Sequence, residues 1–200
     1  APQGGQELWI LLTNGKAKKL FPIEGVHEAL VDETLAPRNG RILGAVTEPS
    51  ISIDGKRAYF TYFHNATDSP LPPDNSGFAG WAKGGDLYVV DLEPLLNDIQ
   101  FPVANLVTSR LTHTSAEPMN PTYAINNAGV VNTGPVEIDN AYGRQLLFAS
   151  TRRMLDNADF KMARMNKNYN LFTADLKTQP GGSFTLKNIK QAQYYTTTSG

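Results

Sequence analysis

The sequence contains no cysteine among its 200 residues. Disulfide bonds, cysteine-ligated zinc and covalently attached c-type haem are therefore excluded on this chain. Chains without thiols occur inside and outside the cell, with a tilt towards secreted and periplasmic proteins. We therefore expect a periplasmic or extracellular protein.

An excess of charge of one sign is also lacking. The 18 Lys and Arg residues nearly balance the 19 Asp and Glu residues, which gives a formal net charge of -1. No basic surface for nucleic acid is predicted. Charged residues make up only 18% of the chain, so we expect other protein to cover part of its surface.

Long apolar runs and catalytic motifs are missing as well. The longest apolar run, "LWILL" at 8–12, has the length of a strand, whereas about 20 residues are needed to span a bilayer. The sequence holds no Gly-x-Ser-x-Gly elbow, Walker loop or dinucleotide fingerprint. The Gly-rich stretch 75–85 lacks the Lys-Ser/Thr pair of a phosphate-binding loop. No catalytic residue is predicted.

Strand signals dominate what is present. Aromatic and aliphatic runs bounded by turn residues predict strands at 7–12, 57–63, 86–92, 144–150 and 170–176. Short helices are predicted at 25–36, 93–98 and 156–165. The 17 Gly and 13 Pro residues indicate long, punctuated loops. Together these features predict an all-β protein.

Parts of the sequence repeat each other. The aligned pairs are Pro49 with Pro121, Gly55-Lys56-Arg57 with Gly143-Arg144-Gln145, Tyr59-Phe60 with Leu147-Phe148, Asp86-Leu87-Tyr88 with Asn170-Leu171-Phe172, and Asp91-Leu92 with Asp175-Leu176. Leu8-Trp9 fits the Leu87-Tyr88 place, and edge strands are predicted at 16–22, 107–113 and 183–189. In the second copy, residues 124–142 are predicted to replace the tight turn with a long insertion.

The repeat predicts four-stranded antiparallel units: a strand entered at Pro, a Gly turn, a strand, a loop, a strand ending in Asp-Leu, and an edge strand. Units of this kind arranged radially make a β-propeller. Residues 1–200 then form a single partial propeller domain, with blade parts at about 1–24, 40–113 and 114–190. The blades exceed the roughly 40–50 residues of a minimal blade through insertions at about 64–84, 93–105 and 125–142.

About two full blades and part of another do not close a ring, which takes ~4–8 blades. Either the chain is a piece of a longer protein, or partner chains complete the ring. These alternatives stay open at the level of sequence.

The motif Pro-x-x-Ser-x-Asp-Gly-Lys-x-x-x-Phe, which runs here from Pro49 to Phe60, resembles the blade motif of TolB-type propellers. "RLTHTSAEPMNPTYA" at 110–124 resembles the lead into the next blade, and "LFASTRR" at 147–153 resembles its strand exit. The stretches "YFHN" and "GGDLYVVDLEPLL" are also similar to the propeller of hydrazine synthase alpha-subunit-like proteins. Those are extracytoplasmic multihaem proteins, and the similarity implies haem on a partner segment.

Most motif residues have structural explanations. Asp54-Gly55 is a hairpin turn signal, and the aromatic residues from Tyr59 to Phe63 alternate as packing positions. His64 stands apart, because it follows the aromatic strand and opens an insertion that contains Asp68. A neutral imidazole can ligate a metal, and a carboxylate can orient its other nitrogen.

The remaining ligand-binding candidates are His113, Arg152 and Arg153. His113 follows the Arg-Leu-Thr strand, and the two arginines could pair with an anionic ligand or form surface salt bridges. Asp68, Asp74 and Asn75 could suggest calcium, although their spacing differs from that of an EF-hand loop. No metal site is predicted.

We consider three functional hypotheses. The first is a non-catalytic binding or scaffold domain of an extracytoplasmic protein, whose loop insertions contact partner domains or subunits, within a larger assembly. The second, implied by the resemblance, is the propeller portion of a multihaem oxidoreductase. The third is a propeller that gates a separate hydrolase domain.

Overall fold

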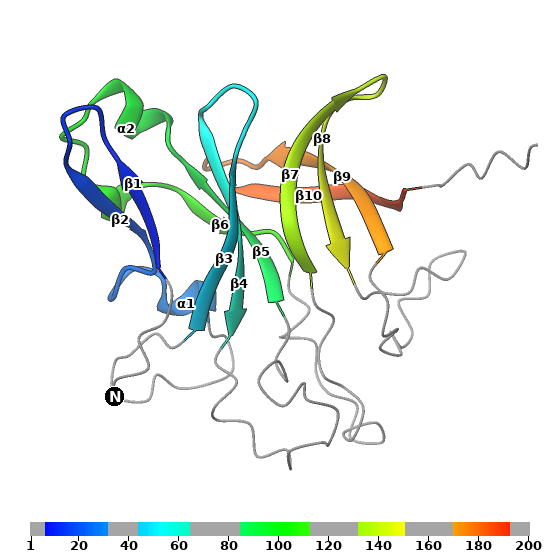
Figure 1. Ribbon diagram of the computed structural model, residues 1–200, viewed down its shortest axis with the longest axis horizontal. Helices are drawn as coiled ribbons and strands as arrows, with labels where there is room; N and C mark the ends of the chain where they lie inside the picture. The colour runs from blue at the N-terminus through cyan, green and yellow to red at the C-terminus, as the bar shows by residue number, and fades with distance from the viewer. Residues whose placement is uncertain (1–6, 32–43, 65–84, 113–131, 151–169, 193–200) are drawn as a thin grey trace, which may run out of the picture.

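The computed structural model describes residues 7–31, 44–64, 85–112, 132–150 and 170–192. These residues form three antiparallel sheets, which stand side by side in chain order (Figure 1). One sheet has two strands and the other two have four strands each. The prediction of an antiparallel β protein built from four-stranded units is confirmed. The sheets form an open row within the described residues.

The first sheet is a hairpin of two strands, β1 (Leu8–Leu11) and β2 (Ala17–Phe21). The short helix α1 (Glu28–Val31) follows it. The helix predicted at 25–36 therefore starts at Glu28, and its part beyond Val31 lies outside the described residues. The helix predicted at 156–165 lies outside them too.

The middle sheet runs in the strand order β3-β4-β5-β6. Its strands are β3 (Gly44–Ile51), β4 (Arg57–His64), β5 (Gly85–Asp91) and β6 (Thr108–Arg110). Helix α2 (Glu93–Asn97) and the 3₁₀ helix η2 (Val103–Asn105) separate β5 from β6. The helical turn predicted at 93–98 is confirmed. Pro94 in its first turn suits this position, because the first amides of a helix have no intrahelical partner.

The third sheet has the corresponding strand order, β7-β8-β9-β10. Its strands are β7 (Asn132–Asn140), β8 (Gly143–Ser150), β9 (Asn170–Thr178) and β10 (Phe184–Gln191). Only Ala141 and Tyr142 join β7 to β8. The prediction that a long insertion replaces this turn is therefore wrong. Gly143, with φ of 93°, supplies the left-handed backbone that the turn needs.

The prediction that Pro49 marks a strand entry is also wrong. Pro49 lies inside β3, where the register with β4 shifts between Thr47 and Ser50. A bulge leaves residues unpaired, so a proline without an N–H fits there. The register of β7 with β8 shifts in the same way between Thr133 and Val136. Pro135 thus holds the place of Pro49, whereas Pro121 lies outside the described residues.

The two bulges also meet each other. Glu48, which precedes Pro49, has φ of 52°, and its counterpart Gly134 has φ of 62°. The Glu48 carboxylate accepts hydrogen bonds from the Gly134 amide at 2.8 Å and from the Thr133 hydroxyl. A left-handed conformation costs a non-glycine residue roughly 1–2 kcal/mol. These bonds between β3 and β7 offset that cost.

Two hydrophobic cores lie between the sheets. The hairpin packs on one face of the middle sheet through Leu8, Leu20 and Phe21, which meet Phe60, Tyr62 and Tyr88 among others. The opposite face of the middle sheet contributes Tyr59, Leu87 and Val89, which pack against Leu146, Phe148, Phe172 and Ala174 of the third sheet. Strands β4 and β5 are therefore buried on both faces. This explains the nearly continuous apolar sequence "DLYVV".

Candidate functional site

The strand ends of the middle and third sheets gather at one edge, at the bottom of the view in Figure 1. Gly44 pairs with His64, and Phe63 pairs with Gly85. In the third sheet Ser150 lies between Asn132 and Asn170. The segments 65–84 and 151–169 therefore leave and re-enter the described fold at this edge. We call it the insertion edge.

A buried ion pair stands at the insertion edge of the middle sheet. Arg110 Nη2 donates to Asp86 Oδ2 at 2.7 Å, and both side chains are almost completely buried. The Thr112 hydroxyl donates to the other carboxylate oxygen of Asp86 at 2.7 Å. Arg110 also donates to the carbonyl groups of Thr112 and Leu30, at 3.1 and 3.3 Å. Such a pair is stable only when hydrogen bonds also satisfy its remaining atoms, and these bonds do so.

The same cluster reaches the third sheet. Asn132 Nδ2 donates to Thr112 Oγ1 and to the Gly85 carbonyl, each at 3.3 Å. The Ser150 hydroxyl donates to Asn132 Oδ1 at 2.8 Å. Asn132 and Ser150 are fully buried. A continuous chain of hydrogen bonds therefore holds the ends of β5, β7 and β8 in fixed relative positions.

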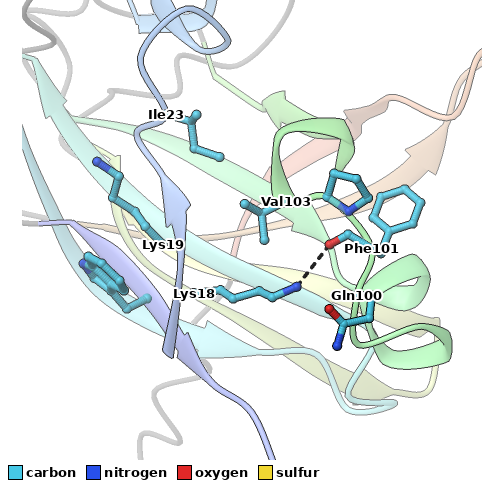
Figure 2. Close-up of a pocket in the computed structure, with 8 residues that line it drawn as sticks. Lys18, Lys19, Ile23, Gln100, Phe101 and Val103 are labelled. Carbon is cyan, nitrogen blue, oxygen red and sulfur yellow. Dashed lines mark hydrogen bonds between the residues drawn. The ribbon is translucent and has the colours of Figure 1, made fainter. Parts of the chain in front are cut away.

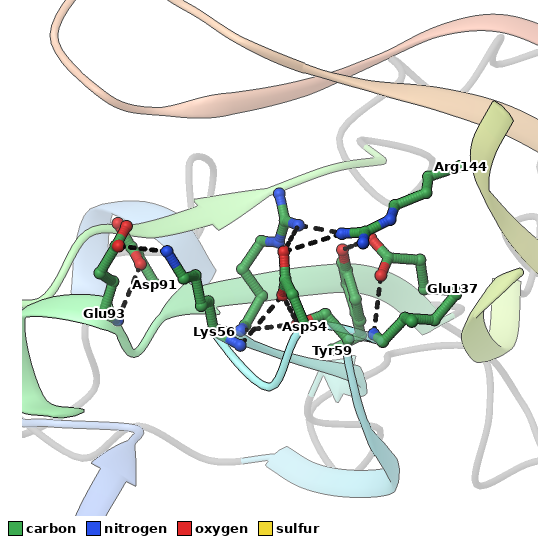
Figure 3. A network of polar contacts seen from close by, with 10 residues as sticks. Asp54, Lys56, Tyr59, Asp91, Glu93, Glu137 and Arg144 are labelled. Carbon is green, nitrogen blue, oxygen red and sulfur yellow. Dashed lines mark hydrogen bonds and ion pairs between the residues drawn. The ribbon is translucent and has the colours of Figure 1, made fainter. Parts of the chain in front are cut away.

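A second polar network joins the sheets at the opposite edge, where the tight turns lie (Figure 3). The Glu137 carboxylate of β7 accepts from the Ile53 amide at 2.8 Å and from the Tyr59 hydroxyl at 3.1 Å. Burial raises the pKa of Tyr59 above its ordinary range, which keeps the hydroxyl a donor. Arg144 of the third sheet forms an ion pair with Asp54 at 3.0 Å.

Asp54 has a strongly shifted acidity within this network. The Ser52 hydroxyl donates to its carboxylate at 2.7 Å, and the Lys56 amide donates at 3.1 Å. These two bonds lower the pKa of Asp54 to about 2, together with the positive charges of Arg57 and Arg144, and the bond from Ser52 has the largest effect. The ionised Asp54 carboxylate thus joins the middle sheet to the third sheet through Arg144.

The acidity of Asp54 predicts a pH dependence of stability. Its unfolded pKa is about 3.9, so its contribution is complete above that pH and is lost as the pH falls through about 2. The difference in free energy of unfolding between wild type and Asp54→Asn should therefore be constant near neutral pH and shrink below about pH 4. Urea unfolding over a pH series measures it.

Arg144→Met serves as the matched comparison. It removes one cation from Asp54 and leaves the Ser52 and Lys56 hydrogen bonds, so it should reduce the pH-dependent part without abolishing it. A difference for Asp54→Asn that stays constant down to pH 2 would contradict the assignment.

A shallow groove of about 510 Å³ lies between the hairpin and the segment that follows α2 (Figure 2). Its lining includes Trp9, Ile23, Phe101 and Val103. Lys18 Nζ donates to the Phe101 carbonyl at 3.2 Å and to the Ile99 carbonyl at 2.6 Å. The charge of Lys18 is thus engaged with the backbone, and the groove offers mainly apolar surface.

The residues predicted from sequence are only partly located. His64 is the last residue of β4, and its backbone stands at the insertion edge opposite Gly44. The other four, Asp68, His113, Arg152 and Arg153, lie outside the described residues, as do Asp74 and Asn75. Of these candidates, only His64 lies within the described residues.

His27, one of the three histidines of the sequence, has a structural role. It is buried, its ring stacks on Phe21 with centroids 4.8 Å apart, and its Nδ1 accepts from the Ile23 amide at 2.9 Å. Within the described ranges no group of three potential metal-ligating side chains gathers, and no helix there is long and apolar enough to cross a membrane.

Sequence reasoning missed Asp86, Arg110 and Asn132. A signal for Asp86 was available, because it stands directly before the apolar run "LYVV" in a strand buried on both faces. A charge at such a position needs a partner. Nothing in the sequence alone shows that Arg110 supplies it, since the contact spans the connection from β5 to β6.

Comparison with known proteins gives no relative to reason from. No protein-family model, curated protein or solved structure matches the chain.

Proposed function

We propose that this chain is part of a β-propeller that serves as a non-catalytic binding scaffold in an extracytoplasmic protein. The observation that carries the propeller is the repeat itself. Two four-stranded antiparallel sheets share a bulge with proline, Pro49 and Pro135, and pack face to face in chain order. The motif from Pro49 to Phe60, which resembles TolB-type blades, supports the same fold.

The binding role is supported by the insertion edge. The segments 65–84 and 151–169 both start and end there, on neighbouring sheets. The buried cluster of Asp86, Arg110 and Asn132 holds these strand ends rigidly. Rigid elements that position long connections at one edge are typical of binding surfaces. Protein partners, or further blades of the same assembly, would contact these connections.

Shortening the insertions tests this role. Because Ser150 pairs with Asn170, residues 151–169 can be replaced by Asn-Gly, which forms a two-residue hairpin turn. Residues 65–84 can also be replaced by Asn-Gly, which leaves the three-residue hairpin loop His64-Asn-Gly because Phe63 pairs with Gly85. Each variant should stay folded, with its melting temperature within about 5 °C of wild type. Each should lose at least about 90% of the cross-linking to one partner, a hot-spot-sized effect.

The partner set is measured by in-cell cross-linking and quantitative mass spectrometry in the organism of origin. Tyr142→Ser is the control, because Tyr142 is exposed at the opposite edge, and this variant should keep every partner. A partner set that is unchanged in both shortened variants would refute the binding role of these segments. Unfolding of both variants would refute it too, since the segments would then be part of the core.

A further inference from the structure

The interface between the middle and third sheets has two distinct halves. The middle sheet contributes Tyr59 and Thr61 of β4, with Leu87 and Val89 of β5, and each of these is fully buried. The third sheet contributes the facing residues, among them Phe172 and Ala174 of β9. Because the sheets repeat, the positions that correspond to each half can be found on the other sheets.

The first half recurs on the outward face of the third sheet. The register places Leu147 and Ala149 where the middle sheet has Tyr59 and Thr61, and it places Leu171 and Thr173 where the middle sheet has Leu87 and Val89. Val136, opposite Leu147, is 46% exposed. Unlike their buried counterparts, the recurring positions are only partly buried.

The second half recurs on the outward face of the hairpin. Leu8 and Ile10 point to the middle sheet, so Trp9 and Leu11 point away from it, because side chains alternate along a strand. Trp9 and Leu11 then hold the places of Phe172 and Ala174. Phe172 and Ala174 are fully buried, whereas Trp9 is 55% and Leu11 is 74% exposed.

The two kinds of face that meet in this interface are therefore both uncovered at the ends of the row of sheets (Figure 1). The first kind is on the third sheet, and the second kind is on the hairpin. We propose that a second copy of this chain covers the outward face of the third sheet, with its hairpin face of Trp9 and Leu11 packed on Leu147 and Leu171. This extends an interface already present inside the chain. The inference rests on the proposed propeller fold and names its partner surface.

A contact between two different faces is heterologous, and such contacts form a closed ring when the rotation allows it and a filament when it does not. The groove beside Trp9 enlarges the hairpin face, since Trp9 and Phe101 both line it. Burial of two large apolar side chains at the centre of an interface is typical of an energetic hot spot.

Sedimentation velocity of the full 200-residue chain tests the proposal. The wild type should associate with rising concentration, and Trp9→Lys or Leu171→Lys should each weaken association at least about 30-fold. Leu96→Lys is the matched control, because Leu96 is as exposed as Trp9 but lies on α2. If Leu171→Lys impairs folding by circular dichroism, Val136→Lys replaces it.

An experiment that mixes the two variants tests whether the hairpin of one copy contacts the third sheet of the other. Trp9→Lys keeps an intact third sheet and Leu171→Lys keeps an intact hairpin, so an equimolar mixture should form a heterodimer although neither variant associates alone. A wild type that stays monomeric up to its solubility limit overturns the proposal. A Trp9→Lys variant that associates like wild type, or a mixture that stays monomeric, overturns it as well. The shortened-insertion experiment reports on the scaffold role independently, so either can fail without the other.

Discussion

Arg110→Met is expected to lower the free energy of unfolding by about 3–5 kcal/mol, the cost of leaving a buried charge without its partner. The substitution keeps an unbranched side chain of similar length, so it removes the charge and the donors while filling most of the volume. Asp86 would lose the 2.7 Å bond from Arg110, and the Leu30 carbonyl would lose one donor. Urea unfolding followed by circular dichroism measures the effect.

Two comparisons isolate the buried pair as the cause. Lys56→Met breaks the exposed ion pair with Glu93, which should cost much less, because exposed ion pairs contribute little to stability. The double variant Asp86→Leu/Arg110→Met removes both charges, and it should regain part of the loss because a buried ion pair is often replaceable by apolar residues. If Arg110→Met costs no more than Lys56→Met, the pair does not anchor the insertion edge.

Phe21→Ala is expected to destabilise the protein by about 3–5 kcal/mol, as large-to-small substitutions of buried aromatic residues do. Phe21 is fully buried, and its ring lies 4.8 Å from that of Phe60, 5.2 Å from that of Tyr62 and 5.3 Å from that of Tyr88. These contacts join the hairpin to the middle sheet. The loss should therefore appear first as faster hydrogen exchange in β1 and β2.

Leu11→Ala is the matched control for the hairpin. Leu11 stands on the outward face of β1 and is 74% exposed, so its truncation should change the stability of the monomer by no more than about 0.5 kcal/mol. Equal hydrogen exchange of the hairpin in both variants would show that Phe21 is not what holds it. A Phe21→Ala variant in which the third sheet opens first would contradict the assignment equally.

Strand positions were predictable because alternation and turn residues are local signals. All five principal strands and the three edge strands occur in the structure close to their predicted ranges. The bulges were harder to place. The alignment of Pro49 with Pro121 ignored the shared pattern Thr-x-Pro at 47–49 and 133–135, which marks both bulges. The spacing between the bulge and the turn also differs between the repeats, because Pro135 precedes Gly143 by two residues more than Pro49 precedes Gly55.

The candidate site was less predictable for a different reason. Ligand candidates such as His64 were chosen from residue type and position, and both criteria favour the insertions. The polar residues that organise the insertion edge lie instead within or directly after regular strands. Asp86 and Arg110 are far apart in sequence and meet only because β5 pairs with β6. Pairing between strands is a tertiary property that composition does not reveal.

The bulge contact has a consequence for the order of the sheets. Glu48 joins β3 to the bulge of β7, but its counterpart on the third sheet is Gly134, which has no carboxylate to offer. The two sheets are therefore not interchangeable modules. A tandem protein made by concatenating the middle sheet would keep the carboxylate bridge at every junction, whereas one made from the third sheet would lack it.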